Sequence, residues 1–268
     1  MLGLVALWSV LYCLVISGLQ ERHDQQVLYS KFREQLSGQI KVAPVGGDIT
    51  PGAPVALISM PRLGLQDTVV VQGTASGDLE SAPGHARDTV LPGQLGTSVI
   101  YGRSVMFGGP FANLPGARPG DVITTLTGQG RATFVVTDLR RAGAPYPPAL
   151  PADGARLTLA TSESSGWRSG WAPSDVVYVD ATLKGKAFAD GALATAVTPD
   201  AERAMVGDTS ALYPLVLWLP LLGCAFALVV WAQERWGRWQ TWIVGMPVVL
   251  AALWGTTETA VELLPNLF

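Results

Sequence analysis

The chain has 268 residues, enough for two domains of ordinary size or for one domain with appended segments. Hydrophobic residues make up 49% of it and charged residues only 15%, whereas an average globular chain is about 25% charged. This combination excludes a disordered chain and indicates membrane segments. The net charge of −3, without clustered Lys and Arg, excludes a nucleic-acid-binding face. The 30 glycines and 19 prolines favour a turn-rich, all-β soluble part over a helical bundle.

The first apolar segment, Leu2–Leu19, carries no charged side chain and is about long enough to cross a bilayer as a helix. A cleaved signal peptide is the alternative, but such a peptide usually opens with positively charged residues, and this segment has none. We therefore expect an uncleaved anchor. Apolar residues at helical spacing from Val27 to Leu36 predict that the helix continues into water.

Short β-rich runs, separated by turn residues, follow a Gly/Pro-rich linker. The predicted strands are Val55–Ser59, Thr68–Gln72, Ser98–Tyr101, Asp121–Leu126, Arg131–Leu139, Arg156–Ala160 and Asp175–Leu183. Seven or eight strands without a long helical pattern between them indicate a closed barrel or a sandwich. An Ala/Gly-rich linker then leads back toward the membrane.

Two further apolar segments, Ala211–Ala232 and Thr241–Thr257, predict a transmembrane helical hairpin. The loop between them, QERWGRWQ, places Arg235 and Arg238 among tryptophans, which is typical of a membrane interface on the cytoplasmic side. We therefore expect a cytoplasmic turn between the second and third helices and an extracytoplasmic β domain at the cell membrane.

This organisation has six parts. They are an anchor with its helical extension (1–37), a linker (38–53), the β domain (54–183), a second linker (184–210), the helical hairpin (211–258) and a short tail (259–268).

Cysteine and histidine usage limits the chemistry. Cys13 and Cys224 both lie in apolar segments, so they predict neither a disulfide framework nor a thiolate metal site. The only histidines are His23 and His85, which excludes a His-rich metal site and leaves His85 as the one candidate for a histidine base. We expect no metal and no cofactor.

A series of short motifs in a fixed order carries more specific information. The motifs are ISMPRLGL (Ile58–Leu65), LESAPGH (Leu79–His85), LPGQLGTSVIYG (Leu91–Gly102), FGGPFANL (Phe107–Leu114), PGD (Pro119–Asp121), LTLAT (Leu157–Thr161) and VVYVDA (Val176–Ala181). Over roughly residues 54–183 the chain resembles the sortase family, in the class E type of actinobacteria. The resemblance implies a closed eight-stranded β-barrel on the outer face of the membrane. It also implies kinship with cysteine transpeptidases, which cut a sorting signal and join the acyl group to a cell-wall amine.

All three catalytic positions of the family are substituted here. Arg103 stands in the place of the histidine, and a guanidinium stays protonated and cannot act as a base. Ser162 stands in the place of the cysteine, and a serine without a neighbouring base is a poor nucleophile. Ser174 and Asp175 stand in the place of the arginine, and a carboxylate would repel an oxyanion. The pattern predicts a pseudosortase with no catalytic residues.

The sequence leaves open two ways in which other residues could supply the missing catalytic groups. His85 could approach Ser162 as a base, although a structural role for this histidine is the alternative. Arg103 or Arg168 could supply the oxyanion contact, although a solvated arginine is the alternative for each.

A proline-rich loop, Ala142–Gly154, lies where sortases have a connection that helps to form the groove for the sorting signal. A plain surface loop is the alternative. The candidate binding residues are Arg103, Pro145, Tyr146, Pro147 and Pro148.

We therefore expect a binding or assembly protein that holds a segment of a secreted or surface protein, or another membrane protein, without cutting it. Three membrane helices would offer more surface for helix packing than one anchor does. The alternatives are a residual transpeptidase or acyl transferase that uses Ser162 with His85, and a structural subunit of a membrane complex.

Overall fold

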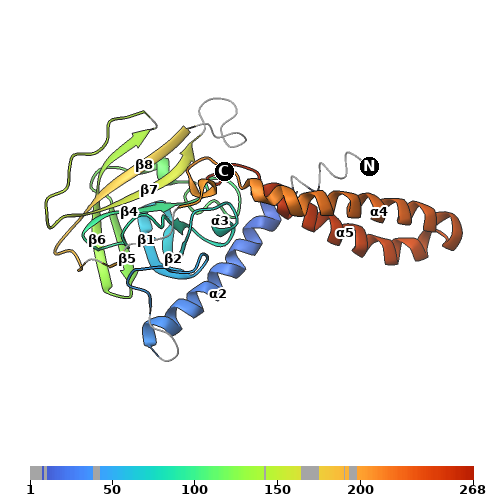
Figure 1. Cartoon of the computed structure of the whole chain (residues 1–268), viewed down its shortest axis with the longest axis horizontal. Helices are drawn as coiled ribbons and strands as arrows, with labels where there is room; N and C mark the ends of the chain where they lie inside the picture. The colour runs from blue at the N-terminus through green and yellow to red at the C-terminus, as the bar shows by residue number, and fades with distance from the viewer. Residues whose placement is uncertain are drawn as a thin grey trace. The chain divides into compact units, whose positions relative to one another are not determined.

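The computed structural model describes residues 8, 11–38, 43–141, 143–163, 175–189, 191–192 and 198–268. Contacts divide it into two compact units, Met1–Val206 with Asn266–Phe268, and Gly207–Pro265. The first unit contains a β-barrel and the second a pair of long helices (Figure 1).

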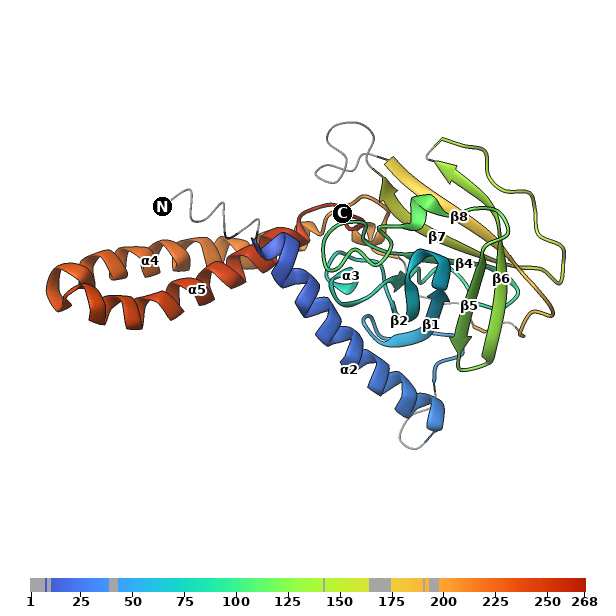
Figure 2. The same ribbon diagram turned by 180° about the vertical axis from the view of Figure 1, so that it is seen from behind.

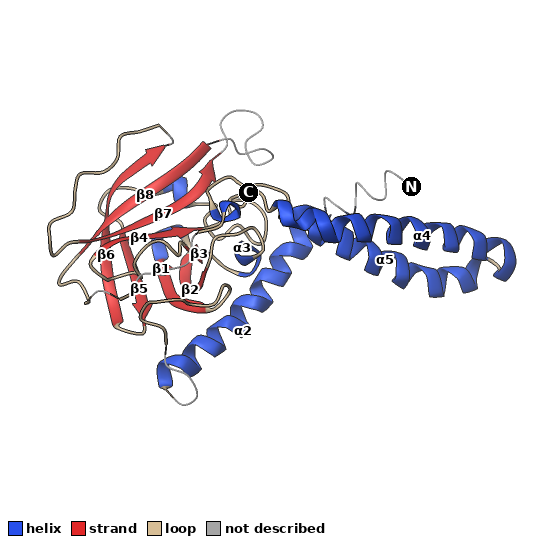
Figure 3. Cartoon of the chain, viewed as in Figure 1, coloured by secondary structure: helices blue, strands red, loops and turns tan. Residues whose placement is uncertain are grey.

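The first unit is built around a closed eight-stranded barrel, in the order β1-β2-β3-β4-β7-β8-β6-β5 (Figure 3). Of the adjacent pairs, β2–β3 and β4–β7 are parallel and the others are antiparallel. The strands are β1 (Pro54–Met60), β2 (Leu65–Gln72), β3 (Gly84–His85), β4 (Gly96–Tyr101), β5 (Val122–Thr127), β6 (Gly130–Arg141), β7 (Ala155–Glu163) and β8 (Asp175–Leu183).

Seven of these strands overlap the seven that the sequence predicts, and the barrel rather than the sandwich is found. The strand missed by sequence is β3, whose two residues are too few to show an alternating pattern. The expectation of an all-β fold holds for the barrel but not for the chain, which is mixed α/β because three long helices accompany the barrel.

The barrel interior is filled by alternate side chains from its strands. In β6, Ala132, Phe134 and Val136 are buried while the residues between them are more exposed. Ile58 and Leu157 are fully buried in the same cluster. This packing fixes the positions of the strand ends. The candidate site lies where several of them meet, at one end of the barrel.

Helix α2 (Ser17–Ser37) packs on the outside of β1 and β2 (Figure 2). Its Leu28 and Phe32 are buried beside Val69. The Gln25 side-chain amide accepts a hydrogen bond from Val69 N at 2.8 Å and donates one to Val69 O at 3.2 Å. The helix ends at Gly38, whose φ of +67° suits glycine. Most of the predicted anchor that precedes α2 lies outside the described residues.

The second unit is a helical hairpin of α4 (Leu212–Trp236) and α5 (Arg238–Glu262). Both helices are long and apolar enough to cross a membrane, a finding that rests on length and composition. The predicted loop is almost entirely helical, because only Gly237 separates the two helices. Trp236 and Trp239 are exposed at this turn.

Candidate functional site

The strands β4 and β7 lie side by side and in parallel, so their carboxyl ends meet at one end of the barrel. Tyr101 pairs with Ala160, which places Arg103 and Ser162 just beyond a matched position on neighbouring strands. The Thr161 hydroxyl donates to Gly102 O at 2.8 Å and holds these two ends together. The fold therefore brings together two of the three positions at which the sequence resemblance implies catalytic residues.

Ser162 is almost completely buried, and its two hydrogen-bond partners in the described part of the chain are a hydroxyl and a peptide carbonyl. Its Oγ donates to Leu267 O at 2.6 Å. The Ser104 Oγ lies 2.7 Å from Ser162 Oγ and 3.2 Å from the same carbonyl oxygen, Leu267 O. Neither partner is a base, so this arrangement does not activate the serine as a nucleophile.

Arg103 has no exposed surface, and its side chain points into the molecule. Its Nη2 donates to Ser76 O and to Ser76 Oγ, both at 2.8 Å, and its Nε donates to Leu79 O at 3.2 Å. The guanidinium also stacks on the ring of Phe107, 4.8 Å from the ring centre. These contacts join the loop after β4 to the turn around α3 (Asp78–Ser81).

His85 is buried beside β2 and makes its contacts there. Its Nε2 donates to Val90 O at 2.8 Å, and its Nδ1 lies 3.0 Å from Gln72 Oε1. Burial lowers the pKa of His85 to about 4, so the imidazole is neutral at physiological pH. Both ring nitrogens are engaged with these neighbours rather than with Ser162.

The remaining predicted positions are only partly described. Asp175 begins β8 opposite Glu163 and is exposed. Arg168 and Ser174 lie outside the described residues.

The segment Asn266–Phe268 forms part of the barrel unit, a contact that the sequence does not predict. Asn266 and Leu267 have no exposed surface. The Leu267 side chain packs in a cluster with Leu79, Ala160 and Val176. No local pattern in the sequence predicts this contact, because Leu267 and Ser162 are 105 positions apart.

A groove of about 700 Å³ is lined by residues of β4, β6, β7 and β8 and of the loop that follows β6. Tyr101 and Tyr178 line the groove and also pack against the cluster that contains Leu267. Burial raises the pKa of Tyr101 to about 12, so its phenol stays protonated and cannot serve as a base. Two of the predicted binding residues, Tyr146 and Pro147, form part of the groove wall.

The groove contains arginines, but their charges are engaged. Arg140 pairs with Asp180, and Arg141 pairs with Glu163. Arg156 donates to Pro148 O at 2.6 Å and so ties the floor of the groove to its proline-rich wall. Two of these three arginines are therefore paired with a carboxylate, and the third binds a backbone carbonyl.

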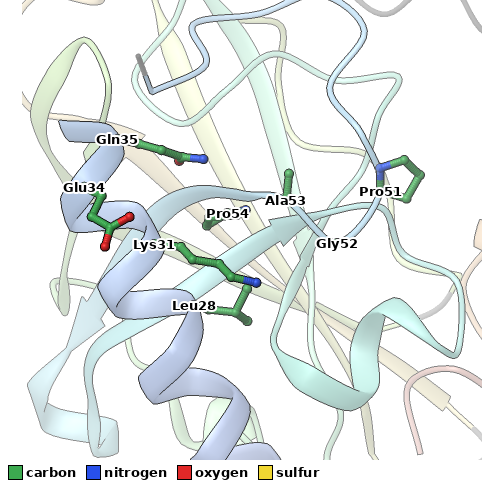
Figure 4. A pocket seen from close by; sticks show the side chains of 8 residues that line it. All are labelled: Leu28, Lys31, Glu34, Gln35, Pro51, Gly52, Ala53 and Pro54. Atoms are coloured by element: carbon green, nitrogen blue, oxygen red, sulfur yellow. The ribbon is translucent and has the colours of Figure 1, made fainter. Parts of the chain in front are cut away.

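A second hollow, of about 410 Å³, lies between the end of α2 and the start of β1 (Figure 4). It contains Lys31 and Glu34 but none of the predicted site residues. Within the described ranges, no group of three or more His, Cys, Asp or Glu side chains is placed to hold a metal ion.

Comparison with known proteins agrees with the motifs. Residues 58–168 match the family model of the sortase domain. No curated protein matches the chain.

Several solved sortase structures are similar. A Clostridium perfringens sortase D5 transpeptidase is 21% identical, covering 62% of this chain and 98% of its own, with a TM-score of 0.45. The SrtA sortase from Actinomyces oris is 22% identical, covering 56% and 89%, with a TM-score of 0.46. Sortase E from Streptomyces avermitilis is 27% identical, covering 58% and 100%, with a TM-score of 0.40.

Proposed function

We propose that this chain is a membrane-anchored protein whose sortase-like domain binds or assembles a cell-surface protein or a membrane partner without acyl transfer. The hydrogen bonding of Ser162 is the observation that carries the proposal. The hydroxyl at the position of the nucleophile donates its proton to a peptide carbonyl, which cannot take the proton away.

The chemistry of a serine transpeptidase needs, besides the nucleophile, two groups that this site does not bring to Ser162 among its described residues. A base must accept the Ser162 proton, but Arg103 is a permanent cation and the ring nitrogens of His85 are engaged elsewhere. A cation or a set of donors must also face the oxyanion. The Arg103 guanidinium is buried against Ser76 and Leu79, so it acts as a structural residue of the neighbouring loop.

The proposed location follows from the helices and from the groove. The two apolar helices support attachment to the cell membrane, and Arg235 and Arg238 support a cytoplasmic hairpin turn. The barrel would then face the outside, where its groove can meet secreted and surface proteins.

The test is a search for an acyl-enzyme. The purified full chain is incubated with sorting-signal peptides in two parallel samples. One sample is analysed by intact-protein mass spectrometry, and the other contains hydroxylamine, which releases acyl groups from esters as hydroxamates. We expect no mass increase and no released hydroxamate, with Ser162→Ala giving the same result as the natural chain. An ester on Ser162 that is absent from Ser162→Ala would show that the protein is an enzyme.

A further inference from the structure

The segment Asn266–Phe268 is held in the candidate site as a bound peptide would be. Its backbone carbonyls accept hydrogen bonds from successive amides of the loop after β4. Ser104 N donates to Leu267 O at 3.1 Å, and Met106 N donates to Phe268 O at 3.1 Å. The Ser162 hydroxyl adds a second donor to Leu267 O.

The side chains of the segment are recognised as well. Asn266 Nδ2 donates to Thr74 O at 2.7 Å and to Arg203 O at 3.0 Å, and its Oδ1 accepts from Met205 N at 2.9 Å. The Leu267 side chain fills the apolar cluster described above. Backbone hydrogen bonds provide affinity in extended-peptide recognition, and pockets for individual side chains provide specificity. Both are present here.

We propose that Asn266–Phe268 is a tethered occupant of a peptide-binding site centred on Ser162. The ligand of this site is an extended peptide that presents an asparagine followed by a large aliphatic residue. The inference rests on the proposed function, because it takes the site to be one that binds rather than cuts. A partner segment of the same chemistry has to displace the tethered one.

The tether gives the internal segment a strong advantage. Residues 263–265 connect it directly to α5, so it competes at the effective concentration of an intramolecular ligand, about millimolar for a short flexible linker. A free peptide at micromolar concentration is therefore excluded from the site in the intact chain. Removing the segment should open the site.

The experiment measures binding of a fluorescent peptide, Leu-Leu-Pro-Asn-Leu-Phe, which has the sequence of residues 263–268. The peptide is made with free and with amidated carboxyl ends, and binding to the purified protein in detergent is followed by fluorescence anisotropy. The proteins are the full chain, a variant that lacks Asn266–Phe268, and full-length Asn266→Asp. Asn266→Asp turns a carboxylate toward Thr74 O and Arg203 O, where the amide donates. The matched control is Asn113→Asp, an exposed site.

We expect the deletion variant and Asn266→Asp to bind the peptide at least about tenfold more tightly than the full chain and Asn113→Asp. A peptide with Asp in place of Asn should bind none of them. Hydrogen exchange provides a second measurement. The amides of Ser104 and Met106 should lose protection in the deletion variant and regain it when the peptide is added.

Three results would overturn the proposal. They are equal binding by the full chain and both variants, no binding by variants that remain folded, and unfolding of the barrel in both variants, since the segment would then be an obligate part of the fold. An ester on Ser162 in the peptide-bound deletion variant would have a different meaning. It would refute the non-enzymatic function and leave the tethered occupant in place.

Discussion

Arg103 is a buried residue that orders the loop after β4. The resemblance to sortases implies that this is the position of the histidine that exchanges protons. Here the side chain is buried and joins Ser76, Leu79 and Phe107. The loop that it anchors carries the Ser104 and Met106 amides, which bind the carbonyls of Asn266–Phe268. Arg103 is therefore a positioning residue for this loop, and any effect that it has on partner binding is indirect.

His85 predicts a pH dependence of barrel stability. Its pKa is lowered by burial from 6.5 to about 4 in the folded state. Between these two values the unfolded chain binds a proton that the folded chain does not, so the free energy of unfolding falls as the pH falls from about 6.5 toward 4. The slope from this one group is at most about 1.4 kcal/mol per pH unit.

The change that tests this is His85→Gln, with unfolding followed by pulse proteolysis in urea. Its free energy of unfolding should decline less steeply over that range than that of the natural chain. The matched control is His23→Gln, on the exposed side of α2, which should retain the natural profile. If the free energy of unfolding had the same pH dependence in the natural chain and in both variants, His85 would have the same pKa in the folded and unfolded states.

At the scale of elements, neighbouring residues of β6 form two ion pairs that differ in burial. Arg140 pairs with Asp180, and their side chains are 12% and 0% exposed. Arg141 pairs with Glu163, and their side chains are 58% and 27% exposed. Removing one partner of a buried pair leaves an uncompensated charge, whereas an exposed pair contributes little.

We predict that Arg140→Met lowers the free energy of unfolding by about 3–5 kcal/mol and that Arg141→Met lowers it by less than about 1 kcal/mol. Urea unfolding under the same conditions measures both. Combining Arg140→Met with Asp180→Asn should recover part of the loss, because the buried charge is then removed. Similar losses of unfolding free energy in Arg140→Met and Arg141→Met would contradict the assignment of Asp180 as a buried charge that Arg140 stabilises.

The same strand shows where sequence reasoning ends. The β-rich composition predicts Arg131–Leu139, but β6 continues through Arg141 because it pairs with Tyr178 and Val177 of β8. That extension depends on tertiary pairing, which no local pattern encodes. The loop predicted between the apolar helices is reduced to one residue, Gly237. Its φ of +90° lets the chain reverse there without further non-helical residues.

The sequence predicts where the candidate site lies but not which partners its side chains contact. The order of the motifs located Arg103 and Ser162 at strand ends, and the parallel pairing of β4 and β7 brings these ends together. The partners of both side chains come from distant segments, at 27 residues for Ser76 and 105 residues for Leu267. Long-range contacts of this kind follow from the folded barrel and not from local spacing.

At the scale of the whole molecule, the proposed function requires the barrel and the hairpin turn to lie on opposite sides of the membrane. The turn carries Arg235 and Arg238 among exposed tryptophans, as expected for a cytoplasmic interface. Two single-cysteine variants test this, in a chain in which Cys13 and Cys224 are replaced by serine. Tyr146, which is 92% exposed in the wall of the groove, reports on the barrel.

Trp239 is the better reporter for the turn, because it is 82% exposed and the positive φ of Gly237 would strain any other residue there. A membrane-impermeant maleimide added to intact cells should label Tyr146→Cys and leave Trp239→Cys unlabelled. Permeabilised cells should show both labelled, which establishes that each cysteine is reactive. Labelling of Trp239→Cys alone in intact cells would reverse the orientation. Labelling of both would mean that the hairpin does not cross the membrane, and the groove would then no longer be separated from the turn by the bilayer.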